Sequence, residues 1–297
     1  MDQTILPPSQ FRLSMVSIDT RFADQYYYGT SDFMVRLPST MRNVMRITLS
    51  SIELPEVAYV FSAKNGNTCF SINGVTVSIP ESSYASAGAM VPVIATAITS
   101  SAVAGVTCGY DTAANRFFFS KTAGAPVTVS LTSLTNSPCA AACTEAVAQN
   151  DRYWGIGYNL GFRDKEITVP AGGSIYATQP PQVTSPAYYL LQVRCPDMME
   201  NTLHRTGQGS FVQALAKIVL RNGAYAVNYD DMGNMMRKTN TFRSPTSVSQ
   251  LRVSLVDVYG RLVEMGDTDW SMTFEMMEVI SSCQYNELNM AGSGMRC

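Results

Sequence analysis

The strongest constraint on the fold is an alternation of apolar and polar residues with a period of two. It recurs along much of the chain, for example over 33–37, 45–49, 127–131 and 270–276. Successive side chains of a β-strand point to opposite faces of a sheet, so each run is typical of a half-buried strand. Residues 70–79 predict a hairpin, because their central Asn-Gly suits a type I′ turn.

Shorter signals extend this pattern. Prolines fall between the runs, and proline cannot donate to a central ladder, so they mark strand boundaries. A helix is expected over about 87–100, with Met90, Ile94 and Ile98 on one face, and a weaker one over 139–149. Many short strands and little helix indicate an all-β antiparallel sandwich or barrel. Further strands are expected near 106–110, 115–120, 165–169, 174–178, 187–195, 214–221 and 248–258.

The ends of the chain differ from its middle. We expect an N-terminal arm over 1–17, which contains Pro7-Pro8, and a C-terminal tail over 281–297, which is poor in bulky residues. A length of 297 residues would permit two domains. The strand pattern instead favours a single domain over 18–280 with an elaborated insertion at about 132–186.

Composition excludes several functions. Only 15% of residues are charged and the net charge is -2, which argues against direct nucleic-acid binding. There is one histidine, His204, and it lies in a polar loop, whereas zinc hydrolases need two or three imidazoles. No apolar run is long enough to span a membrane. Seven scattered cysteines are best explained by a reduced, cytosolic setting.

Motifs that carry enzyme chemistry are missing as well. The sequence contains neither a phosphate-binding Gly-x4-Gly-Lys-Ser/Thr loop nor a Gly-x-Ser-x-Gly nucleophile elbow. Asp230-Asp231 and Asp267-x-Asp269 are carboxylate pairs, but they are more typical of turns than of a cation loop. We therefore expect no enzyme activity, no cofactor and no metal.

Apolar residues with no obvious place in one core suggest contact surfaces. The chain has 17 methionines, which either fill irregular gaps in the core or cover partner surfaces. The sequence leaves these two interpretations open. The candidate interface residues are Trp154, Tyr225, Tyr229, Met235 and Met236.

Three stretches together carry a family resemblance. The first runs from Ile18 to Ser62 and includes Asp19, Arg21 and Phe22. The second, Leu251–Arg261, and the third, Asp269–Glu275, contribute Asp257, Tyr259, Gly260, Arg261 and Trp270. These stretches resemble the minor capsid and penton-type proteins of nucleocytoplasmic large DNA viruses.

The resemblance implies a jelly-roll fold and a structural role in an icosahedral virion assembled in the host cytoplasm. It implies contacts with the major capsid protein and with minor capsid neighbours, and a homo-oligomer if the chain lies at the vertex. From the residues themselves, Gly260 should allow a sharp turn, and Asp257 or Arg261 should satisfy its backbone. The alternative function is a surface-displayed β-sandwich that binds carbohydrate or a receptor.

Overall fold

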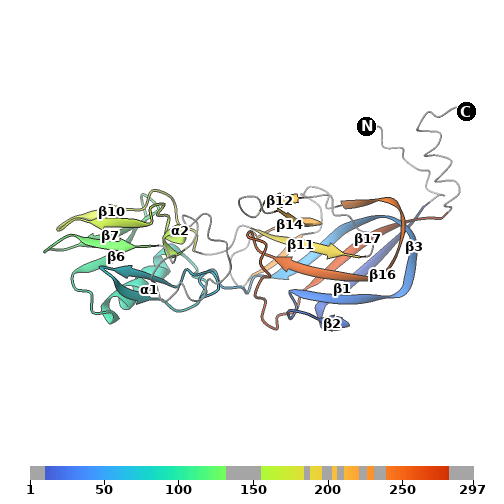
Figure 1. Ribbon diagram of the computed structural model, residues 1–297, viewed down its shortest axis with the longest axis horizontal. Coiled ribbons are helices and arrows are strands. Elements are labelled where there is room, and N and C mark those ends of the chain that lie inside the picture. The colour runs from blue at the N-terminus through green and yellow to red at the C-terminus, as the bar shows by residue number, and fades with distance from the viewer. Residues whose placement is uncertain are drawn as a thin grey trace, which may run out of the picture. The chain divides into compact units, whose positions relative to one another are not determined.

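The described part of the chain folds into antiparallel β-sheets and two short α-helices (Figure 1). The computed structural model describes residues 11–131, 155–183, 188–195, 203–205, 211–220, 226–230 and 239–280. It divides into two compact units. Unit 1 comprises Met1–Val57, Tyr188–Arg221 and Ala226–Cys297, and unit 2 comprises Ala58–Ala187 and Asn222–Tyr225.

Unit 1 is built on one eight-stranded curled sheet. Its main path runs β1-β17-β3-β16-β11-β14, while β2 and β15 also pair with β3. A separate hairpin joins β12 and β13. The strands are β1 (Phe11–Asp19), β2 (Gln25–Tyr26), β3 (Asp32–Pro55), β11 (Tyr188–Arg194), β12 (Leu203–Arg205), β13 (Phe211–Gln213), β14 (Ala216–Val219), β15 (Val227–Asp230), β16 (Thr239–Val256) and β17 (Ser271–Val279).

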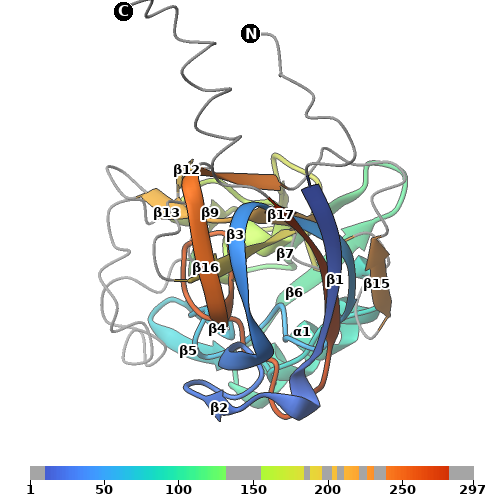
Figure 2. The same cartoon turned by 90° about the vertical axis from the view of Figure 1, so that its right-hand side faces the viewer.

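Strand β3 is the centre of this sheet and is 24 residues long. Its pairing with β16 and with β17 is interrupted by register shifts. Such irregularities bend a strand and increase its twist, and Figure 2 shows β3 curving through the sheet. Strand β3 contributes buried side chains from its first three residues and again from Val44 to Leu54, among them Phe33 and Ile47.

Unit 2 contains shorter strands in two small sheets. One has the order β5-β4-β8-β9 and the other β10-β7-β6. An apolar core among the described residues of the unit includes Phe70, Phe119 and Phe162. The elements are β4 (Cys69–Ile72), β5 (Val75–Ser78), α1 (Ala87–Ser100), β6 (Val106–Asp111), β7 (Arg116–Lys121), β8 (Val127–Ser130), α2 (Ile156–Leu160), β9 (Glu166–Val169) and β10 (Ser174–Tyr176).

Helix α1 forms where the sequence predicted it. Ser86 caps its N-terminus, with Oγ accepting a hydrogen bond from the amide of Ala89 at 3.1 Å. Met90, Ile94 and Ile98 are buried on one face. The weaker helix expected over 139–149 lies outside the described residues.

The domain boundaries differ from the expectation in two places. Unit 2 starts at Ala58, not near 132, because it includes the 70–79 hairpin and helix α1. Strand β1 begins at Phe11, so residues 11–17 belong to the sheet and not to an arm. Local periodicity identifies strands but does not show which of them pair. Phe11, Leu13 and Met15 do alternate with Arg12 and Ser14, but this run is short and follows Pro7-Pro8 closely.

One cysteine differs from the expected reduced state. Cys69 is disulfide-bonded, whereas the buried Cys108 is a free thiol. Scattered spacing in a sequence carries no information on which sulfurs approach one another in space.

Candidate assembly interface

Asp19 and Arg21 form the turn that follows β1. The backbone amide of Arg21 donates to Asp19 Oδ1 at 3.0 Å, and Arg21 Nη2 lies 2.6 Å from Asp19 Oδ2. These hydrogen bonds from Arg21 hold the pKa of the Asp19 carboxyl below its usual value. The turn is the 3-10 helix η2 (Thr20–Phe22), and it leaves Phe22 76% exposed.

Phe22 belongs to a group of exposed rings that we call the aromatic corner: Phe22, Tyr26, Tyr27 and Tyr28. The three tyrosines are 46%, 46% and 43% exposed. The hydroxyl of Tyr26 donates to the carbonyl of Thr20 at 2.5 Å, which holds its ring beside η2. Exposed aromatic residues that follow one another this closely in the chain suit a contact surface, because such surfaces are enriched in tyrosine, phenylalanine and arginine.

An ion pair between Asp32 and Arg252 lies next to the aromatic corner. Asp32 is buried, and its carboxylate accepts hydrogen bonds from Arg252 Nε at 2.9 Å and Ser254 Oγ at 2.9 Å. Burial raises the pKa of Asp32, but the hydrogen bonds from Arg252 and Ser254 outweigh it and leave that pKa lowered. The guanidinium of Arg252 lies 4.1 Å from the centre of the Tyr27 ring. Sequence reasoning missed this pair, because only the register of β3 with β16 brings the two residues together.

Trp270 directly precedes β17 and contacts residues around the turn after β1 and the start of β3. Its side chain is 3% exposed and packs edge-to-face on Phe33, with ring centres 5.8 Å apart. Its indole Nε1 donates to the carbonyl of Thr30 at 2.8 Å, and its amide donates to Thr20 Oγ1 at 3.0 Å. The structure therefore brings the first and third sequence stretches together as a structural support.

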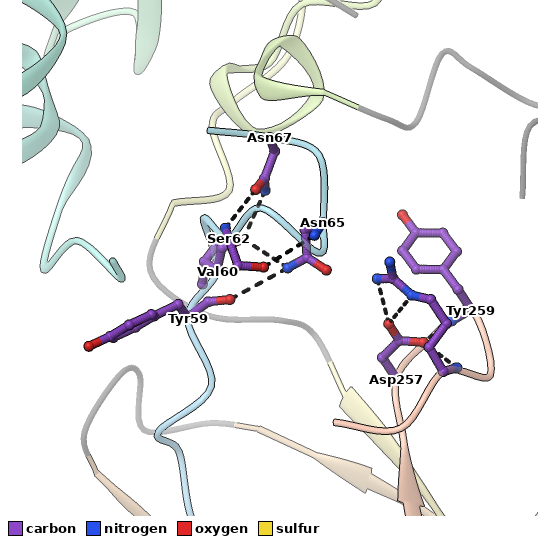
Figure 3. Close-up of polar contacts among 8 residues, drawn as sticks. Tyr59, Val60, Ser62, Asn65, Asn67, Asp257 and Tyr259 are labelled. Carbon is purple, nitrogen blue, oxygen red and sulfur yellow. Dashed lines mark hydrogen bonds and ion pairs between the residues drawn. The ribbon is translucent and has the colours of Figure 1, made fainter. Parts of the chain in front are cut away.

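The second stretch forms a closed turn after β16. Asp257 Oδ1 accepts from the amides of Tyr259 and Arg261 at 2.8 and 2.9 Å, and Asp257 Oδ2 accepts from Arg261 Nη2 at 2.7 Å (Figure 3). Gly260 adopts a φ of 81°, in the region that favours glycine. Asp257 and Arg261 satisfy the backbone and each other, so the turn is structural.

A second network in Figure 3 closes a loop of unit 2. The side chain of Asn67 makes two hydrogen bonds to the backbone. Its Nδ2 donates to the Val60 carbonyl at 2.8 Å, and its Oδ1 accepts from the backbone amide of Ser62 at 2.9 Å. Asn65 also donates to the Val60 carbonyl, at 3.2 Å. These asparagines use their side chains to satisfy the backbone, as turn asparagines commonly do.

Strand β1 lies at one end of the main path of the sheet and carries two exposed apolar side chains. Among the described residues, β1 pairs only with β17, although it is nine residues long. Leu13 is 49% and Met15 59% exposed, and Met277 lies opposite Leu13 on β17. Proteins usually protect such an edge with lysine, proline or a short strand. At the other end of the path, β14 has only four residues and carries Lys217.

The candidate interface residues are only partly placed. Tyr229 lies in β15 and is 60% exposed. Trp154, Tyr225, Met235 and Met236 lie outside the described residues, so their role stays a prediction. Met272 and Met276 are buried in the core, whereas Met15 is exposed, so covering of a partner surface by methionines stays a prediction.

The described part of the chain contains no group of three His, Cys, Asp or Glu residues that could hold a metal ion. Burial raises the pKa of the Cys108 thiol to about 12, which makes it a poor nucleophile. None of the helices in this part is long and apolar enough to cross a membrane.

Comparisons with known proteins show which known structure has a similar fold. No family model matches the sequence, and no curated protein sequence matches it. The structure is similar to the crystal structure of the mavirus penton protein, with a TM-score of 0.50 and 10% identity, covering 91% of this chain and 100% of that one. The two chains share a fold. This likeness confirms the prediction of an all-β, antiparallel, jelly-roll-like architecture.

Proposed function

We propose that this chain is a structural protein of an icosahedral viral capsid, and specifically a minor capsid protein of a large DNA virus. The observation that carries the proposal is a fold like that of a penton protein over 91% of the chain. The long free edge of β1 and the aromatic corner support it, because both are surfaces suited to a neighbouring chain.

The function is association through burial of these surfaces. Stable interfaces bury roughly 1,200–2,000 Å² in total and favour aromatic residues, methionine and arginine over other charged residues. The chain has 15% charged residues and 17 methionines, which agrees with that composition. Strand addition at β1 would satisfy its free backbone groups, and Leu13 and Met15 would be buried by the added strand.

The position in the shell follows from the type of contact. At a vertex, each copy contacts the next through two different surfaces, and five copies close a ring. On a facet, the chain cements neighbouring capsomers. The partners are the major capsid protein and minor capsid neighbours, and the vertex ring is our preferred arrangement because the structural neighbour is a penton protein.

A charge on the β1 edge tests this function. Coexpression of Leu13→Lys with the major shell protein of the same genome should lower its incorporation into purified particles at least about tenfold, because a lysine blocks edge pairing. The matched control is Val75→Lys, at a similarly exposed valine on β5 of unit 2. Equal incorporation of wild-type protein and Leu13→Lys would contradict the role of this edge.

A second candidate function is carbohydrate or receptor binding at the surface. It is favoured by Tyr176, which is 48% exposed and lies beside Phe118, with ring centres 5.1 Å apart. Phe118 in turn lies over Gly109, where any Cβ would meet its ring at 2.3 Å. Binding on a glycan array that Tyr176→Ala abolishes would favour this function over the structural one.

A further inference from the structure

The aromatic corner of unit 1 has the chemistry of a binding surface for proline-rich segments. Phe22, Tyr26, Tyr27 and Tyr28 are all exposed, and two of the rings are held in place, Tyr26 by the Thr20 carbonyl and Tyr27 by the Arg252 guanidinium. Extended polyproline II segments dock on surfaces lined by such rings, because their conformation is preformed and little entropy is lost on binding.

The chain itself contains a suitable segment. Residues 1–10 lie outside the described part, and their sequence includes Ile5-Leu6-Pro7-Pro8. Consecutive prolines fix φ and favour the extended polyproline II conformation. The segment has one charged side chain, that of Asp2, so an apolar aromatic surface suits it.

Distance along β1 separates this segment from the corner of the same copy. The segment joins β1 at Phe11, whereas η2 and β2 follow the other end of the strand at Asp19 (Figure 2). At about 3.3 Å per residue, these two ends of β1 are about 26 Å apart. Pro8 precedes Phe11 by three residues and reaches at most about 11 Å from it. Pro7-Pro8 therefore cannot reach the corner of its own chain.

We propose that residues 1–10 of one copy dock through Pro7-Pro8 on the aromatic corner of a neighbouring copy. The proposal rests on the proposed function and names a partner for one of its surfaces. The two surfaces in this contact differ, so it is head-to-tail and can close a ring when the rotation between copies permits.

A labelled peptide tests the docking without any particle. A fluorescent peptide with the sequence of residues 1–10 is titrated against the full-length Pro7→Ala/Pro8→Ala chain, in which the native prolines no longer compete, and its anisotropy is measured. Saturable binding is expected. Phe22→Ala and Tyr27→Ala, each added to this chain, should weaken it about tenfold, as loss of an aromatic contact at a binding hot spot does.

Two controls make the result specific. Tyr176→Ala removes from unit 2 a ring about as exposed as that of Tyr27 and should leave binding unchanged. A peptide with both prolines replaced by alanine should bind at least tenfold more weakly. The absence of saturation at about 1 mM, the effective concentration that short tethers provide, would overturn the proposal, as would equal binding of the two peptides or equal losses in Phe22→Ala and Tyr176→Ala. In that case the wild-type chain would still be incorporated into particles. Failure of the docking proposal can therefore be distinguished from failure of the proposed capsid function.

Discussion

The two units of the chain reach the same kind of antiparallel sheet in different ways. Unit 1 uses long strands, with 24 residues in β3 and 18 in β16, and pairs residues far apart in sequence, such as Asp32 with Arg252. Unit 2 uses strands of three to six residues and a 14-residue helix, and most of it is the continuous segment 58–187. Unit 1 therefore depends on both ends of the chain, whereas unit 2 depends mainly on local contacts.

The largest expected effect tests the long-range packing of unit 1. Trp270→Ala should destabilise unit 1 by about 3–5 kcal/mol, because it leaves a cavity beside Phe33 and removes the hydrogen bond to the Thr30 carbonyl. Hydrogen exchange should accelerate in β3 and β17 and stay unchanged in β4 and β5. An unchanged thermal melt would contradict the buried position of Trp270, and exchange that accelerates equally in both units would show that the two units unfold together.

The matching test in unit 2 uses a glycine. Gly161 has a φ of 91°, and a Cβ there would lie 2.0 Å from the Gln179 carbonyl oxygen. Gly161→Ala should destabilise unit 2 by about 2–4 kcal/mol through backbone strain and overpacking. Gly124→Ala is the control, since its φ is 93° but no atom lies within 4 Å of the added Cβ. Equal denaturation midpoints for the two variants would exclude the clash as the cause.

Acid should weaken unit 1 through Asp32. The pKa of Asp32 is lowered in the folded chain. Its contribution to the free energy of unfolding is therefore present above the usual pKa of 3.8 and is lost as the pH falls through the folded pKa. We expect a contribution of about 1–2 kcal/mol, since Arg252 is partly exposed to solvent. In urea titrations, Asp32→Asn should remove this loss of stability below about pH 4. If the variant lost as much stability in acid as the wild type, other carboxyl groups would be the cause.

A smaller effect is expected at the start of helix α1. Ser86→Ala should destabilise unit 2 by about 1 kcal/mol, because the amide of Ala89 loses its capping partner. Thr99→Ala is the control, since its hydroxyl only donates to the Ala95 carbonyl within the helix. If the chemical denaturation midpoint of unit 2 shifted equally for both variants, the cap would make no specific contribution to stability.

The smallest effect on stability belongs to the free edge of unit 1. Leu13→Lys should change the stability of the isolated chain by no more than about 0.5 kcal/mol, because Leu13 is 49% exposed. Its effect on incorporation into particles should nevertheless be large. A thermal shift of many degrees in the isolated chain would mean that Leu13 serves the fold and not a contact.

The sequence predicted what local patterns encode. The alternation of Met272, Phe274 and Met276, the Asn73-Gly74 hairpin and the buried face of α1 are all present. These features depend on residues close together in the chain. Asn73 has a φ of 47° and Gly74 one of 81°, as a type I′ turn requires.

Features that depend on pairing could not be predicted. The start of unit 2 at Ala58, the free edge of β1 and the Asp32–Arg252 pair all follow from which strands become neighbours. Asp32 and Arg252 both lay within stretches that carried the family resemblance, but no spacing rule joins residues 220 positions apart. Similarly, exposed Leu13 and Met15 look in sequence like core residues of an ordinary strand.

Imaging of particles tests the central claim most directly. Electron cryomicroscopy of particles assembled by coexpression of this chain with the major shell protein of the same genome should show density for unit 1 within the shell, in closed five-fold rings at the vertices. In these rings the β1 edge of each copy should be covered by a neighbouring chain. Particles that close fully without this chain, or that carry it with the β1 edge exposed to solvent, would contradict the account.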